Sequence, residues 1–164
     1  MKEMPYNRAA AVAYAHTWAK ARNPKYADFD KMGGDCTNYA SQCLFAGTGV
    51  MNYTRDTGWF YTNLNSRAAG WTSVKYLYSF LTRNKGQGPF GHEAPLYEAE
   101  EGDLVQLKLG NGDFQHTPVI VCVGKPLDLG SVLVAAHTYD CDLRPLNTYA
   151  IEDIRFIHID GYRK

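Results

Sequence analysis

The spacing of apolar residues changes from a helical to a strand-like period along this chain, and that change constrains the fold most. From Tyr6 to Arg22, apolar or small residues recur at steps of three and four, which indicates an amphipathic helix that ends at Asn23-Pro24. A second helix is predicted to begin at Asp35, a favourable N-cap residue, and to end near Gly47. A third is predicted from about Thr72 to Asn84. The first half is therefore expected to be helical.

Short apolar runs replace this pattern in the second half. Strands are predicted at Leu104–Leu107, His116–Val123, Val132–Ala136 and Ile154–Ile159. Residues 48–71 and 86–102 show no clear period and are predicted to be loops. Because the helices precede the strands, the predicted class is α+β, with N-terminal helices packed on one side of a small curved antiparallel sheet. No repeat or linker interrupts the pattern, so residues 1–164 are predicted to form one domain.

Composition excludes several classes of protein. A chain of 164 residues can bury a core without the help of a metal or a disulfide framework. Its 17 basic residues equal its 17 acidic ones, which argues against a nucleic-acid partner. No apolar run approaches the ~18 residues of a membrane span. The N-terminus has no apolar signal-peptide region, which predicts a cytoplasmic protein or, alternatively, a mature or excised domain of the cell envelope. The oligomeric state is not indicated.

The segment Gly33-Gly34-Asp35-Cys36-Thr37-Asn38 is the strongest chemical signal. A cysteine in the first turn of a helix lies at the positive end of the helix dipole, so the pKa of the Cys36 thiol is expected to be lowered. The two glycines would let a substrate backbone approach closely. A small buried residue at a helix start is the alternative interpretation. Cys43, on the same face, is expected to be a core residue of this kind.

Two histidines could assist Cys36. If residues 116–123 and 131–138 form a hairpin, the numbers of paired residues sum to about 254, so His116 faces residue 138, or 137 after a shift of one residue. His116 and His137 are therefore predicted to lie at the same end of the hairpin. A nucleophile, a base and a polar group that orients the base are the parts that covalent acyl transfer requires.

The chain resembles the "Putative amidase domain" family of the papain-like cysteine hydrolases, relatives of NlpC-type and CHAP-type cell-wall hydrolases. The resembling stretches are Tyr6–Val12, Asn23–Tyr26, GGDCTNYASQCL at 33–44, GDLVQL at 102–107, HTPVIV at 116–121 and AAHTYD at 135–140. The resemblance implies a papain-like or NlpC-like fold with the nucleophile at a helix N-terminus. It implies a triad of Cys36 as nucleophile, His116 as base and His137 in the third position, for which Asp140 is a near alternative.

The resemblance also implies a reaction. The thiolate of Cys36 would attack an amide carbonyl to give a thioester that water hydrolyses, and no cofactor is needed. The backbone N–H of Cys36 would donate to the oxyanion, and Tyr26 could supply a second donor. Peptidoglycan stem peptides are the substrate that the family suggests. Trp59 and Trp71 could form a wall of the substrate groove, although a small core under the loop explains them equally.

Two other functions compete with hydrolysis. The same thioester could be passed to an amine, which would make the protein an amide-forming transferase. A structural zinc module could use Cys36, His116, His137 and Cys141, since the last two are four residues apart.

Overall fold

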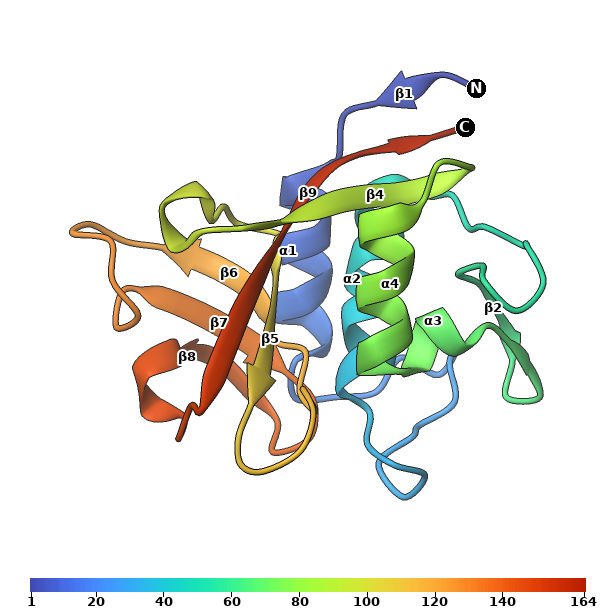
Figure 1. The fold of residues 1–164 in the computed structure, drawn as a ribbon. Coiled ribbons are helices and arrows are strands. Elements are labelled where there is room, and N and C mark those ends of the chain that lie inside the picture. The colour runs from blue at the N-terminus through green and yellow to red at the C-terminus, as the bar shows by residue number, and fades with distance from the viewer.

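The computed structural model describes residues 1–164 and consists of a helical layer packed against a curled antiparallel sheet. The helices are α1 (Arg8–Trp18), α2 (Cys36–Thr48), the short α3 (Ala69–Thr72) and α4 (Val74–Arg83). In Figure 1, α1, α2 and α4 run beside one another, and most of the sheet lies to their left. No helix combines the length and the apolar character that crossing a membrane requires.

The main sheet contains seven strands, all antiparallel to their neighbours. They are β1 (Glu3–Met4), β4 (Gly88–Ala94), β5 (Leu104–Lys108), β6 (Val119–Val123), β7 (Val132–Ala136), β8 (Cys141–Pro145) and β9 (Asp153–Arg163). The order is β1-β9-β5-β6-β7-β8, and β4 pairs with β9. The long β9 pairs with β5 along its first half and with β4 along most of its length (Figure 1). A small separate hairpin is formed by β2 (Tyr61–Asn63) and β3 (Ser66–Arg67).

Successive residues of the strands enter different cores, because side chains alternate between the two faces of a sheet. The face toward the helices contributes Leu104, Val119, Val121 and Ala135 to a cluster that also contains residues of α1, α2 and α4. The other face carries a smaller cluster with Val105, Leu107, Ile120 and Val134, which is covered by Leu146. The strand β6, which begins at Val119 and not at His116 as predicted, therefore separates two apolar layers.

The α+β class and the helices-then-sheet arrangement are confirmed. The predicted strand Val132–Ala136 is observed with the same bounds, whereas the first helix is shorter than predicted and ends at Trp18. The prediction of a loop at 86–102 is wrong, because β4 lies there. Pro89 and the irregularity between Phe90 and Gly91 interrupt the alternating pattern, which an edge strand tolerates.

Residues 48–71 also contain more structure than predicted, since they include β2 and β3. Trp59 and Trp71 are both fully buried, so the suggestion that they wall a substrate groove is wrong. Their rings lie 4.7 Å apart between centroids, and both indole N–H groups donate to residues of α2, Ser41 and Asn38 respectively. They belong to the core that fixes the position of α2.

Candidate active site

Cys36 is the first residue of α2, directly after a tight turn of the chain. Gly33 and Gly34 have φ values of 99° and 106°, a region that favours glycine, and they turn the chain into the helix. The carboxylate of Asp35 does not cap α2, contrary to the prediction. It accepts instead from the backbone N–H of Phe29 at 2.8 Å and the side-chain amide of Asn38 at 2.9 Å. Asp35 thus ties the preceding loop to the start of the helix.

The sulfur of Cys36 lies beside the backbone of His116. Its Sγ is 3.9 Å from the carbonyl oxygen of Gln115, and it also accepts a hydrogen bond from the backbone N–H of Thr117. The hydroxyls of Thr37 and Thr117 are 3.1 Å apart and join the same two segments. The start of α2 therefore packs against the segment just before β6 that carries His116.

The ring of His116 lies on the sheet face that bears the smaller core. Its centroid is 5.6 Å from that of Tyr149, and its backbone is paired with that of Leu107, a member of the same cluster. Neither ring nitrogen has a hydrogen-bond partner in the protein, and neither is completely shielded from solvent. Burial, and then the positive charge of Arg144, lower the pKa of His116 to about 4. The ring is therefore neutral near pH 7.

Burial also keeps Cys36 uncharged. Its side chain is only 7% exposed, and this desolvation raises the pKa of the thiol above its ordinary value, although hydrogen bonds from Thr117 and Thr37 oppose the shift. The prediction of a lowered pKa is thus wrong, because the cost of burying a thiolate exceeds the effect of the helix N-terminus. The pair rests as a thiol and a neutral imidazole.

His137 lies on the opposite face of the sheet from His116. Its ring stacks on Tyr39 of α2 at 4.1 Å, its Nδ1 is hydrogen-bonded to Asp35, and its Nε2 is 2.7 Å from the carbonyl oxygen of Trp18. The predicted register is present at Val119–Ala135 and Ile120–Val134, whose numbers sum to 254. Without a shift this register places residue 138 opposite His116, so the adjacent residue 137 points to the other face.

Asp140, the alternative third residue, also makes no hydrogen bond to His116. Its carboxylate accepts two hydrogen bonds from the guanidinium of Arg22, at 2.8 and 3.0 Å. Arg22 additionally pairs with Asp30 at 2.6 Å and approaches Asp35 at 3.6 Å. These charges raise the pKa of Arg22 against the effect of its partial burial. The network anchors the chain after α1 to the β7–β8 turn, where Asp140 lies.

Tyr26, expected as a possible oxyanion donor, belongs to the aromatic core. Its ring stacks on that of Trp71 at 5.9 Å and lies tilted against that of Tyr61 at 5.1 Å, and partial burial raises the pKa of its hydroxyl. It does not line the groove that contains Cys36. The structure thus leaves the backbone at the start of α2 as the predicted donor to an oxyanion.

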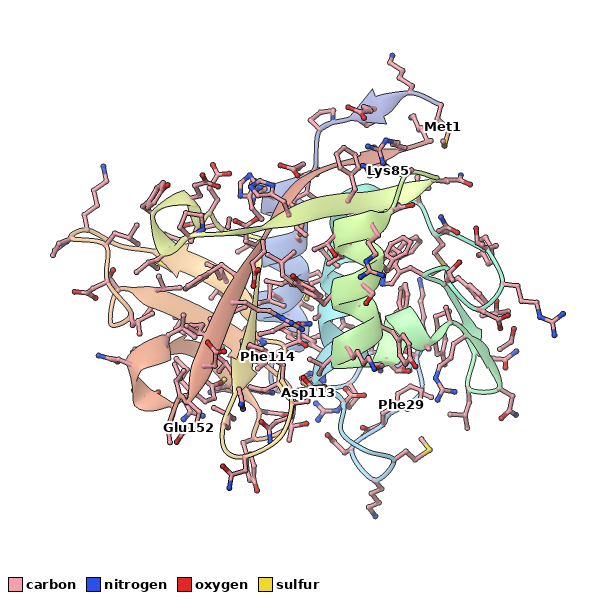
Figure 2. All side chains as sticks on the ribbon, in the orientation of Figure 1. Met1, Phe29, Lys85, Asp113, Phe114 and Glu152 are labelled. Atoms are coloured by element: carbon pink, nitrogen blue, oxygen red, sulfur yellow. The ribbon has the colours of Figure 1, made fainter.

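A groove of about 380 Å³ opens at Cys36. Two loops form its sides, one with Phe29 and Gly33 and the other with Phe114 and Gln115, and the segment Thr72–Lys75 continues its lining. Phe29 and Phe114 are labelled in Figure 2, on the two sides of the end of α2 that carries Cys36. A peptide-sized group could reach the sulfur from this groove.

The zinc arrangement is not formed. His116 and His137 face different sides of the sheet, and the thiol of Cys141 lies 3.6 Å from the hydroxyl of Tyr149. No three His, Cys, Asp or Glu side chains in the structure are grouped in a way that could hold a metal ion.

The sequence did not indicate that Asp35 binds His137, or that Arg22 is the centre of an ionic network. It also did not indicate that Arg67 and Lys75 line the groove. Asp35 stands inside the GGDCTN segment, so its position beside Cys36 was a usable signal. The other three are brought to the site by contacts that have no local pattern.

One family model and one curated relative match this chain. The family model described as "Putative amidase domain" matches residues 5–159. An uncharacterized protein of Bacillus subtilis (strain 168), YhbB, is 33% identical over 143 residues, which cover 85% of this chain and 43% of that protein. The chain thus spans less than half the length of this curated relative. No solved structure matches the chain significantly.

Proposed function

Since the chain belongs to the "Putative amidase domain" family, whose description indicates amide hydrolysis, we propose that it is a cysteine amidohydrolase in which Cys36 is the nucleophile and His116 the base. The observation that carries the proposal is the position of the Cys36 sulfur. It lies between the carbonyl oxygen of Gln115 and the N–H of Thr117, the two backbone groups that flank His116. A groove leads to this sulfur.

The proposed reaction has two stages. As the sulfur of Cys36 bonds to the amide carbon, its proton passes to a ring nitrogen of His116, and the oxyanion is stabilised by backbone N–H groups at the start of α2. The C–N bond then breaks, and the leaving amine takes the proton from His116. Water adds to the thioester in the same way, giving a carboxylic acid and the free thiol.

The neutral resting pair determines how Cys36 becomes reactive. A thiol of raised pKa and an imidazole of lowered pKa do not form a resting ion pair. The proton therefore moves to His116 during the attack, which is general-base catalysis. His116 lies three residues before β6, and both of its ring nitrogens are free of other partners. In this proposal a substrate in the groove brings the ring and the sulfur into hydrogen-bond distance.

We assign His137 a positioning role. It binds Asp35, and Asp35 in turn holds Phe29 and Asn38 on the two sides of Cys36. In this proposal His137 fixes the start of α2 and the adjoining loop, whereas Asp140 fixes Arg22. In this proposal His137, the third residue of the triad, therefore stabilises the segment that carries the nucleophile.

Peptidoglycan stem peptides are the proposed substrate, on the resemblance to NlpC-type and CHAP-type hydrolases. The test is digestion of purified peptidoglycan by the wild-type protein and by the Cys36→Ala variant, with mass analysis of the released fragments. New carboxyl and amino ends released only by the wild type support the proposal. No release from any wall type would refute the wall substrate, and a library of amide and peptide substrates would then test the amidohydrolase itself.

The same assay distinguishes hydrolysis from amide formation. An added primary amine competes with water for the thioester. Products that carry mainly the added amine, at millimolar concentrations where water is in large excess, would assign the protein to the transferases. Products that are free acids support the hydrolase.

A further inference from the structure

The groove at Cys36 carries positive charge and no negative charge. Of the residues that line it, Arg67 and Lys75 are basic and none is acidic. The whole chain has no net charge, so this local excess does not follow from composition. Arg8, Arg22 and Arg163 all pair with carboxylates elsewhere in the structure. Arg67 and Lys75 form no such pair.

Arg67 is held in a fixed position by neutral groups. Its Nε donates to the hydroxyl of Thr72 at 3.3 Å, and its Nη1 donates to the carbonyl oxygen of Leu64. The guanidinium lies over the ring of Phe29, 4.5 Å from the centroid. Its Nη2 has no hydrogen-bond partner in the protein. A positioned guanidinium with free N–H donors is suited to a carboxylate.

Lys75 adds a second positive charge. It is exposed at the start of α4, its ammonium lies 5.8 Å from the centroid of the Tyr76 ring, and no acidic side chain pairs with it. Thr72 and Ser73 also line the groove; the hydroxyl of Thr72 accepts from Arg67, and that of Ser73 accepts from the backbone N–H of Tyr76. Two positive charges in the groove of the nucleophile favour substrates with a negatively charged group, and can thereby determine which amides reach the sulfur.

We infer that the substrate of Cys36 carries a carboxylate, and that Arg67 and Lys75 bind this carboxylate in the groove. This inference names the substrate class for the proposed function, an acidic peptide or acyl donor, and rests on that function for its catalytic meaning. The anion site itself can be tested without turnover.

The test compares alkylation of Cys36 by iodoacetate, which is an anion, and by iodoacetamide, its neutral isostere. In both reactions the sulfur displaces iodide, a C–S bond forms as the C–I bond breaks, and the thiol proton goes to solvent. Rates are measured at pH 9 and low salt by mass analysis of the peptide that contains Cys36. The ratio of the two rates is compared with that of a small free thiol.

We expect the rate ratio of iodoacetate to iodoacetamide at Cys36 to exceed that of the free thiol by about threefold or more, and to fall with added salt. Lys75→Gln and Arg67→Gln should each reduce the ratio toward that of the free thiol. Lys125→Gln is the matched control, because Lys125 is exposed in the loop after β6, at the far end of that strand from His116. It should leave the ratio unchanged.

A ratio equal to that of the free thiol, or one that neither variant changes, would overturn the inference. Absence of alkylation by both reagents would overturn it as well, since the groove would then be closed to small ligands. If the ratio behaves as expected but no amide is hydrolysed, the anion site stands and the proposed function fails. If amides are hydrolysed and substrates with a free carboxylate have the same KM as their amidated forms, the carboxylate assignment fails alone.

Discussion

The hydroxyl groups of Thr37 and Thr117 lie 3.1 Å apart, and they join the residue after the proposed nucleophile to the residue after the proposed base. Both side chains are buried, and Thr117 is also approached by the amide of Gln106 at 3.4 Å. Because Thr37 belongs to α2 and Thr117 to the segment just before β6, their bond sets how far Cys36 stands from the backbone of His116. This contact couples the two layers of the fold at the site.

Replacing Thr117 by valine removes this bond while keeping the shape of the side chain. We expect a loss of about 1 kcal/mol in the free energy of unfolding and a fall in kcat of about fivefold or more, because the sulfur is less well positioned. Urea unfolding and steady-state kinetics measure the two effects. Thr48→Val is the control, since the buried hydroxyl of Thr48 has no partner, and it should not destabilise the protein. Equal behaviour of the two variants would refute the positioning role of Thr117.

The pH dependence of kcat/KM should report the neutral state of His116. The base works only when unprotonated, so activity is lost as the pH falls through the pKa of His116, which is about 4, instead of near 6.5. Substrates without groups that titrate between pH 3 and 7 are required for the measurement. An acid limb near 6.5 would show that His116 is not the base or that its ring is solvated in the working enzyme.

Replacing Arg144 provides a second test of the low pKa of His116. Its positive charge contributes to the low pKa of His116, after burial. Arg144→Gln should therefore move the acid limb of kcat/KM toward higher pH, since protonation of His116 becomes easier. Arg144 also lies over Tyr149, 3.6 Å from the ring centroid, so a thermal unfolding curve must accompany the profile. A limb that moves to lower pH would contradict the electrostatic explanation.

Runs of apolar residues and turn signals predicted elements of this fold that are buried along most of their length. Four of the five residues of the strand Val132–Ala136 are buried, as are eleven of the thirteen residues of the helix that begins beside Asp35, and both elements were located correctly. β4 and β8 could not be found in this way. β4 contains Pro89 and an irregularity at Gly91, and no residue of β8 is fully buried. β4 depends on pairing with β9, which lies far along the chain, whereas β8 pairs with the adjacent strand β7.

The sequence was sufficient to predict which segments form the site, but not which way their side chains point. The sequence placed Cys36 at a helix start and His137 near the end of a hairpin strand, and the pairing sum of 254 holds beside His116. The direction of each ring depends on which of two adjacent residues faces the helices. A hairpin count that allows a shift of one residue cannot decide which of the two does. The prediction therefore placed His137 next to His116, although the two rings lie on opposite faces of the sheet.

His137 provides the clearest test of how the third position acts. His137 and Asp35 are each about 1% exposed, so His137→Ala leaves a buried carboxylate with fewer partners and should lower the free energy of unfolding by about 3 kcal/mol. The loop at Phe29 and the start of α2 would then be less well fixed, and kcat should fall by about tenfold or more. The acid limb of kcat/KM should nevertheless stay near pH 4, because no hydrogen bond joins His137 to His116.

The matched control is Asp140→Asn, which removes a charge from the partly exposed pair with Arg22. That pair should contribute less than about 1 kcal/mol, because solvent screens it, and kcat should change little. A shift of the acid limb in His137→Ala would show that His137 orients the base directly, as a residue of a conventional triad does. A larger loss of kcat in Asp140→Asn than in His137→Ala would instead assign the third position to the carboxylate. An unchanged limb together with a lower Tm and a lower kcat in His137→Ala supports the indirect route through Asp35, in which the histidine holds the segment of the nucleophile in place.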